Sequence, residues 1–214
     1  MNFQEAKKLI STGENEYVEF KRKVRHPEKI VREIVAFANT RGGHLFVGVN
    51  DDGTCPGIKH AEDEDYILRK SVRELCRPAL GITPDFIRLS DSRHILHYAI
   101  AESNKKPHYA LDEKNQRYGK AYIRVKDQSL QASREMQRIL KLERSQKEAG
   151  FTYGDHEKIL LHYLGTHGHI TLRVFKEISQ LSYRSASDII VSLASNHVIR
   201  VVPREKEDWF VFAE

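Results

Sequence analysis

Cysteine is scarce in this sequence, and long apolar runs are missing. The two cysteines, Cys55 and Cys76, are too few for a disulfide framework or a four-cysteine zinc site. No stretch reaches the roughly 18 consecutive apolar residues of a membrane-spanning helix. The first ten residues carry no apolar segment behind their charges, as a secretory signal would. We therefore expect a reduced, cytoplasmic protein without a membrane partner.

Common nucleotide-binding and zinc-binding motifs are also missing. Four glycines fall within residues 42–53, yet no GxxxxGK[ST] sequence occurs and no GxGxxG opens a helix. The histidines His162, His167 and His169 have no neighbouring cysteine and no HExxH spacing. The sequence thus argues against a P-loop nucleotidase and against a histidine zinc site.

Positive charge is unevenly distributed over the 214 residues. Residues 1–150 contain 28 lysines and arginines against 22 acidic residues, whereas residues 151–214 contain seven against eight. A general attraction to nucleic acid is therefore expected to lie in the first part. A modest excess of lysine is also ordinary in proteins that bind no nucleic acid.

Residues 1–150 combine helix and strand patterns. Helices are predicted over residues 2–11, 28–40, 62–76 and 132–149. Strands are predicted over residues 17–23, 44–49, 86–90, 95–101, 108–111 and 121–125. The order predicts an α+β domain, with a mixed sheet flanked by helices and at least one crossover connection.

A different pattern begins near Gly150. Short helices are predicted over residues 155–165, 171–180 and 183–196, and the apolar runs 198–202 and 209–213 predict a hairpin with a polar tip. Three helices followed by a two-stranded ribbon is the order of a small winged helix-turn-helix domain. The alternative is a helical cap with a hairpin. The predicted domains are therefore 1–150 and 151–214.

The stretch "YVEFKRK", residues 17–23, alternates apolar and polar side chains as a strand with one exposed face does. Glu19 lies on the polar parity, among the candidate phosphate-binding residues Lys21, Arg22, Lys23 and Arg25. The simpler alternative is a surface ion pair between Glu19 and its neighbours, which contributes little stability.

Acidic residues suggest a second kind of chemistry. Glu19 lies on one strand and Asp51 follows the buried strand 44–49, so neighbouring strands would bring both near one divalent ion. The Asp-Asp-Gly sequence at 51–53 is equally typical of a turn.

Several segments together resemble one family. "GENEYVEFKRK", "IVREIVAFANTRGGHLFVGVNDDGTCPGI" and "YGKAYIRVKDQSLQAS" resemble the Schlafen AlbA-type domain, earlier described as a divergent AAA domain, over residues 5–140. The resemblance implies an α/β domain that binds nucleic acid, with a winged helix added in many bacterial members. It also implies that Glu14, Glu19 and Asp51 are the three acids of the members that cleave RNA with Mg²⁺ or Mn²⁺. Those nucleases use two such modules, so a homodimer would supply the second.

These observations predict a cytoplasmic DNA- or RNA-binding protein that acts as a transcriptional regulator. Binding itself needs no cofactor, and Arg184 in the third predicted helix of 151–214 is a candidate groove contact. The first alternative is a metal-dependent endoribonuclease that uses Glu14, Glu19 and Asp51. The second is a protein-interaction module that dimerises through the winged helix.

Overall fold

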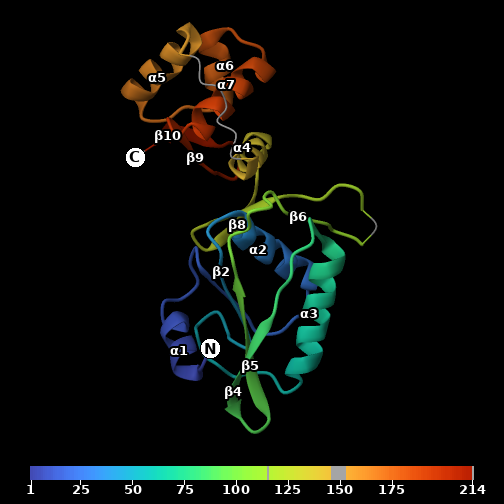
Figure 1. Cartoon of the computed structure of the whole chain (residues 1–214). Helices are drawn as coiled ribbons and strands as arrows, with labels where there is room; N and C mark the ends of the chain where they lie inside the picture. The colour runs from blue at the N-terminus through green and yellow to red at the C-terminus, as the bar shows by residue number, and fades with distance from the viewer. Residues whose placement is uncertain (115, 146–152, 214) are drawn as a thin grey trace. The chain divides into compact units, whose positions relative to one another are not determined.

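The computed structural model describes residues 1–114, 116–145 and 153–213 (Figure 1). The chain divides into two compact units, Met1–Gln131 and Ala132–Glu214. Within the described ranges, no helix is both long enough and apolar enough to cross a bilayer.

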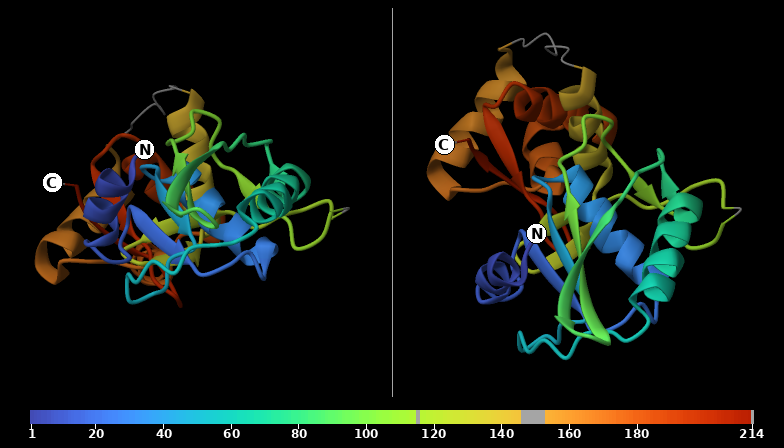
Figure 2. Two further views of the ribbon diagram at one scale, coloured as in Figure 1. Left: turned by 90° about the horizontal axis from the view of Figure 1, so that it is seen from below. Right: turned by 60° about the horizontal axis from the view of Figure 1, so that its bottom comes forward.

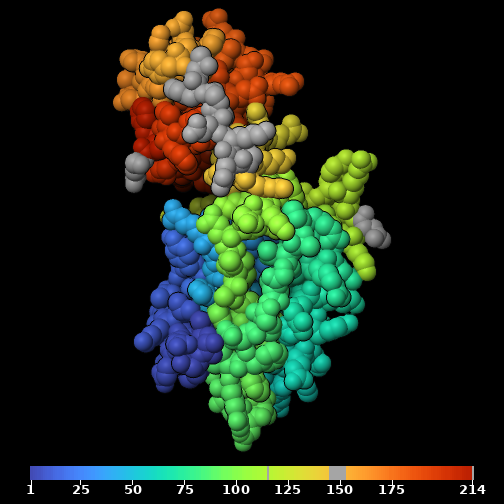
Figure 3. All heavy atoms as spheres, viewed as in Figure 1, coloured from blue at the N-terminus to red at the C-terminus, as the bar shows by residue number. Residues whose placement is uncertain are grey.

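A four-stranded sheet forms the centre of the first unit. Its strands are β1 (Val18–Lys21), β2 (Gly43–Val47), β4 (Pro84–Ser90) and β5 (Arg93–Ile100), in the spatial order β1-β2-β5-β4. β1 and β2 are parallel, and α2 (Pro27–Asn39) makes the crossover between them. The other two pairings are antiparallel, so the sheet is mixed, as predicted. The turn between β4 and β5 projects from one end of this unit (Figure 3).

Apolar side chains cover both faces of this sheet. On one face, α1 (Phe3–Ile10) packs over Phe20 and Phe46. On the other face, α2 and α3 (Ala61–Leu75) pack over Tyr98 (Figure 2). Because both faces are buried, the central strand β2 is a nearly continuous apolar run rather than an alternating one.

Local sequence signals set the helix ends in the first unit. The N–H of Glu5 donates to Asn2 Oδ1 at 2.9 Å, and the N–H of Asn2 donates to Glu5 Oε2 at 2.9 Å, which closes a capping box at α1. After α2 the chain turns at Gly42, whose φ of 76° favours glycine. At Gly43 an added Cβ would lie 2.4 Å from the Phe37 ring, so glycine permits the close approach of α2 and β2.

Two short two-stranded pairings complete the first unit. They are β3 (Cys76–Arg77) with β6 (Tyr109–Ala110), and β7 (Tyr122–Val125) with β8 (Gln128–Gln131). The strands predicted over 108–111 and 121–125 are present in shortened form. β3 and β8 were not predicted, because two to four residues are too few to show a clear periodicity. The β7–β8 hairpin packs against α2.

In its described residues, the second unit has four helices and one hairpin around an apolar core. Its elements are α4 (Arg134–Ser145), α5 (Asp155–His167), α6 (Leu172–Ser179), α7 (Tyr183–Ser195), β9 (Ile199–Val202) and β10 (Trp209–Phe212). The side chains of Leu160, Phe175 and Ile190 are fully buried in its core. The three helices and the hairpin expected after Gly150 are therefore present.

The division between the units differs from the boundary expected at residue 150. It falls after Gln131, because α4 packs on α7 and contributes Ile139 to the core of the second unit. Residues 146–149 of the helix predicted over 132–149 lie outside the described residues. With this division the first unit has 23 basic against 19 acidic residues and the second has 12 against 11. The charge contrast between the units is therefore smaller than the sequence boundary implied.

Candidate nucleic-acid interface

Glu19, in the middle of β1, is buried. Its Oε2 accepts a hydrogen bond from Arg124 Nη2 at 2.6 Å, and its Oε1 pairs with the ammonium of Lys21. The prediction of an exposed polar face on β1 is wrong, because Val18, Glu19 and Phe20 are all buried. The side of β1 that carries Glu19 is covered by the buried side chain of Arg124 and does not face water.

Arg124 of β7 is the centre of this charge cluster, and its side chain is only 1% exposed. Besides Glu19, it donates through Nη1 to Glu33 Oε2 at 2.8 Å and to Ser129 Oγ at 3.3 Å. The guanidinium carbon also lies 4.9 Å from the centre of the Phe37 ring. Residues 122–129 thus meet residues 19–21 of β1 across about a hundred residues of chain.

The carboxylates around Arg124 influence one another. Burial raises the pKa of Glu33 above its usual value, and the nearby charge of Glu19 adds to the rise. Burial likewise raises the pKa of Glu14, although its Oε1 accepts the N–H of Phe20 at 2.8 Å. The negative charges of Glu19 and Asp51 raise the Glu14 pKa further, whereas Lys21 lowers it. Glu14, Glu19 and Asp51 therefore share one electrostatic environment.

The three acids do not form a metal cage as they stand. Across the described residues, no three His, Cys, Asp or Glu side chains are grouped so that they could hold a metal ion. Both oxygens of Glu19 are engaged by Lys21 and Arg124, and one oxygen of Glu14 is engaged by a backbone N–H. A divalent ion bound by Glu19 would have to displace the Lys21 ammonium.

Cations occupy the last residue of β1 and the residues directly after it, 21–25, which we call the cationic segment. Lys23 and Arg25 are exposed, and the side chain of Lys21 is 30% exposed. Arg22 differs, because its Nη1 donates to the carbonyl of Gly57 at 3.1 Å and so fixes the loop after β2. Of the four predicted phosphate contacts in this segment, Lys23 and Arg25 present their charge to solvent, Lys21 is partly exposed and paired with Glu19, and Arg22 has a structural contact.

The fifth predicted contact, Arg184, belongs to the second unit. It lies exposed in the first turn of α7, after the N-cap residue Ser182, whose Oγ accepts the N–H of Ser185 at 3.1 Å. Its neighbour Tyr183 is 54% exposed. The start of α7 therefore presents an arginine and an aromatic ring to solvent.

Arg124, Glu33 and Asn39 had no predicted role in the site, although all three lie in the segments that resemble the family. The buried amide of Asn39 donates to the carbonyls of His108 and Tyr122, each at 2.9 Å, and accepts the N–H of His108 at 2.7 Å. It therefore connects α2 to β7. The sequence signal for these contacts was a polar residue within an apolar segment. A buried polar side chain is hydrogen-bonded, and its partner can lie far away in the sequence.

The family model for the Schlafen, AlbA_2 domain matches residues 14–133, more than half of the chain. The chain belongs to the Schlafen AlbA_2 family. The match ends within two residues of the boundary between the compact units, and it includes β1, Arg124 and the cationic segment. The resemblance that the sequence motifs indicated is thereby confirmed.

Two solved structures show partial similarity to this AlbA_2 protein. One is the N-terminal domain of a RecG-related protein of Nitrosomonas europaea whose name refers to an ATP-dependent DNA helicase. It has 20% identity and a TM-score of 0.42, with 56% of this chain and 86% of that chain covered. The other is the DIP2311 protein of Corynebacterium diphtheriae, with 17% identity and a TM-score of 0.46. The similarity covers 82% of this chain but only 32% of that one.

Proposed function

We propose that the first unit binds nucleic acid, with Lys21, Lys23 and Arg25 contacting the phosphate backbone. The observation that carries the proposal is the position of this cationic segment. It directly follows a strand whose family motif residue, Glu19, is held by Arg124 in the interior. Phosphate contacts of this kind supply sequence-independent affinity that falls as salt rises.

The ion pair with buried Glu19 fixes the position of Lys21, the first residue of the cationic segment. Lys21 donates to the carbonyl of Phe20 at 2.9 Å and pairs with Glu19, so its ammonium is positioned before any ligand arrives. Val24 is buried between the exposed Lys23 and Arg25, and its N–H donates to Glu64 Oε2 at 2.5 Å. A positioned cation loses less conformational entropy on binding than a free one.

The second unit supports a finer proposal, that of a winged helix-turn-helix in a cytoplasmic transcriptional regulator. α5, α6 and α7 are followed by the β9–β10 hairpin, and Ile170 exchanges two backbone hydrogen bonds with Phe210 of this hairpin. In this proposal the Arg184 side chain contacts a groove of the DNA duplex. The unit contains 12 basic against 11 acidic residues, so we expect it to adjust specificity or support a homodimer rather than supply most of the affinity.

The decisive experiment compares two double variants of the full chain that remove the same charge. Lys23→Ala/Arg25→Ala should weaken binding to duplex DNA and to structured RNA, and should reduce the slope of log K against log salt by about 2. The control, Arg88→Ala/Lys114→Ala, removes cations from the β4–β5 end and from the loop after β6. If both double variants weaken nucleic-acid binding equally, net charge alone explains the loss of affinity. That result would overturn the assignment of phosphate contacts to the cationic segment.

A second candidate, endoribonuclease activity by Glu14, Glu19 and Asp51, is supported by their shared electrostatic environment. The engagement of Glu19 by two cations argues against it. The test is cleavage of a tRNA-like substrate by wild type and by Glu14→Gln, each with Mg²⁺, with Mn²⁺ and with a chelator. Cleavage that the variant abolishes supports the enzyme; intact RNA under all conditions counts against it.

A further inference from the structure

Two arginines that lie far apart in the sequence of the first unit converge on one backbone carbonyl. Arg22, directly after β1, donates from Nη1 to the carbonyl of Gly57 at 3.1 Å. Arg93, the first residue of β5, donates from Nη1 to the same carbonyl at 3.2 Å and to that of Pro56 at 3.0 Å. The two Nη1 atoms are therefore no farther apart than the sum of their distances to Gly57, and two positive charges lie side by side.

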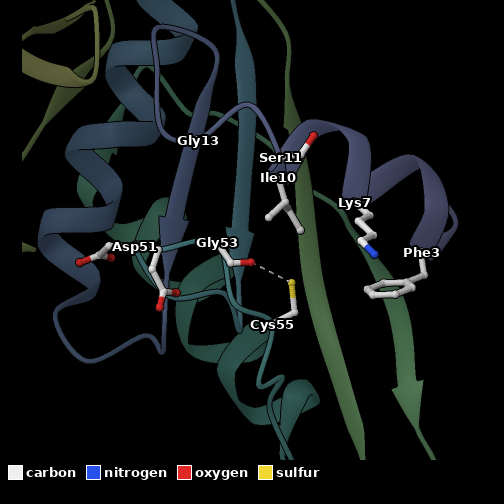
Figure 4. A pocket seen from close by; sticks show the side chains of 9 residues that line it. Phe3, Lys7, Ile10, Ser11, Gly13, Asp51, Gly53 and Cys55 are labelled. Carbon is white, nitrogen blue, oxygen red and sulfur yellow. Dashed lines mark hydrogen bonds between the residues drawn. The ribbon is translucent and has the colours of Figure 1, made fainter.

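The loop that carries this carbonyl is held on both of its sides. Ile58, the residue after Gly57, exchanges two backbone hydrogen bonds with His94, at 2.7 and 3.0 Å. Figure 4 shows an earlier part of the same loop, where Cys55 lies opposite Ile10 of α1. The carbonyl therefore positions both guanidiniums before any ligand binds, and positioned groups lose less conformational entropy on binding than free ones.

Neither of these two guanidiniums has a carboxylate partner in the part of the chain that the structure describes. Arg88 shows the contrast, because it pairs with Asp91. Arg22 and Arg93 are half-buried, and each donates to the loop through Nη1, which leaves Nη2 and Nε as donors for a ligand. Two neighbouring positive charges repel each other, and an anion bound by both removes this repulsion.

We propose that Arg22 and Arg93 together bind the terminal phosphate of a nucleic-acid strand. A guanidinium donates two parallel hydrogen bonds to phosphate oxygens, a geometry that a lysine does not offer. An internal phosphodiester carries one negative charge and would leave one of the two arginines uncompensated. A terminal phosphate monoester carries about 1.5 to 2 negative charges at pH 7, which matches the pair. The proposal rests on the proposed function of nucleic-acid binding.

The arginine pair shares one of its members with the cationic segment. Arg22 lies between Lys21 and Lys23 in the chain, so a strand end bound by the pair has the proposed backbone contacts next to it. Arg22 then has two roles, because it fixes the loop through Nη1 and binds the strand end through its other donors. Arg93 comes from another strand and completes the site through the fold.

The test measures the affinity of the full chain for three single-stranded oligonucleotides of one sequence. One carries a 5′-phosphate, one carries a 3′-phosphate, and one has hydroxyl groups at both ends. Wild type should bind at least one phosphorylated strand about tenfold more tightly than the hydroxyl-ended strand, the contribution of roughly one hydrogen bond to a charged group. The strand that shows the preference identifies which end is bound. Equal affinity for all three strands would overturn the proposal.

Matched variants separate the arginine pair from a general effect of charge. Arg93→Gln should abolish the preference for the phosphorylated strand, whereas the control Arg88→Gln removes the same charge from β4 and should keep it. Arg22→Lys keeps the charge without the planar fork and should reduce the preference. Hydrogen exchange in β1 and β5 checks that each variant is folded, and if Arg93→Gln is not, Arg22→Lys decides. A full preference in the folded variants of Arg93 and Arg22 would contradict the site.

The hydroxyl-ended strand separates this proposal from the proposed function. If wild type binds that strand in a salt-dependent manner and a terminal phosphate adds no affinity, the arginine-pair proposal fails and the backbone contacts stand. If no strand binds even at low salt, the proposed function itself fails.

Discussion

The two units place the same kind of ion pair in different surroundings. In the first unit Arg124 is buried with Glu19 and Glu33. In the second, Arg138 of α4 pairs with Asp188 of α7, and their side chains are 42% and 51% exposed. The core of the second unit is apolar, and the one carboxylate buried beside it among the described residues, that of Glu135, accepts from the Ser187 hydroxyl at 2.7 Å. An ion pair is therefore part of the interior of the first unit, whereas the Arg138–Asp188 pair lies at the surface of the second.

The energetic consequences of the two pairs should differ. A buried charge that loses its partner keeps the cost of its lost hydration. An exposed charge that loses its partner is solvated by water and costs little.

Arg124→Met should destabilise the first unit by about 3–5 kcal/mol, because the partly buried Glu33 would lose its cation and the buried Glu19 would keep only Lys21. Hydrogen exchange measured by mass spectrometry should show the loss in β1 and β7. Trp209, the single tryptophan, lies in the second unit and should report an unchanged fluorescence transition there.

A rescue variant tests the physical reason for this loss. Glu19→Gln/Glu33→Gln/Arg124→Met removes all three charges and should regain much of the stability lost by Arg124→Met alone. If the triple variant is no more stable than Arg124→Met, lost packing rather than uncompensated charge is responsible.

Acid should weaken the first unit through His97, which is buried between two partners. Its Nδ1 lies 3.0 Å from Asp85 Oδ2 and its Nε2 lies 2.9 Å from His44 Nδ1. Burial lowers the pKa of His97, and the hydrogen bond to Asp85 only partly opposes this; burial and the charge of His97 lower the pKa of His44. A second proton on His97 would set two N–H donors against each other.

The sign follows from the lowered folded-state pKa values. The stability that neutral His97 and His44 contribute is present above the pKa of the unfolded state, near 6.5. It is lost as the pH falls through the lowered pKa values of the folded state. We therefore expect the free energy of unfolding to decrease below pH 6.5, less steeply in His97→Gln. Glu14 and Glu33, whose raised pKa values act in the opposite direction, are common to both proteins and cancel in the comparison. Parallel profiles from chemical denaturation of the two proteins would exclude this role for His97.

Arg138→Met should have the smallest effect, a loss of about 0.2–1 kcal/mol, because the pair with Asp188 is half-exposed. Arg138 also donates to the Ser187 hydroxyl at 2.9 Å, and that hydroxyl keeps a second bond to Glu135 at 2.7 Å. The measurement is the Trp209 transition in denaturant. A loss as large as that of Arg124→Met would mean that the two units do not differ as described.

The helices and most strands could be predicted because their apolar periodicity is local. The crossover helix was expected over 28–40 and spans Pro27–Asn39, and α3 was expected over 62–76 and spans Ala61–Leu75. β1 was predicted as a strand, but the burial of Glu19 was not. Alternation shows that two faces differ, and it does not show what covers the polar one.

Only those features of the candidate site that depend on a single residue could be predicted from the sequence. The exposed cations of the cationic segment follow from the sequence, because lysine and arginine are rarely buried without a partner. The pairing of Glu19 with Arg124 depends on a fold that joins positions 105 residues apart. The placement of α4 in the second unit likewise depends on tertiary packing against α7. Neither contact leaves a local pattern.

Arg124 also has a consequence for biosynthesis. β1 is an outer strand of the sheet, and Arg124 donates to the carbonyl of Asn15 at 3.0 Å and more weakly to that of Val18 at 3.4 Å. These contacts add to local ones on the same outer edge, where the Asn15 N–H donates to the Val18 carbonyl at 3.0 Å and the Phe20 N–H donates to Glu14 Oε1 at 2.8 Å. A ribosome adding about 5–20 residues per second needs roughly 5–20 s to travel from β1 to Arg124. Throughout that interval the edge has only its local contacts and Glu19 lacks its arginine partner, so chains that end before Arg124 should aggregate more readily than chains that include it.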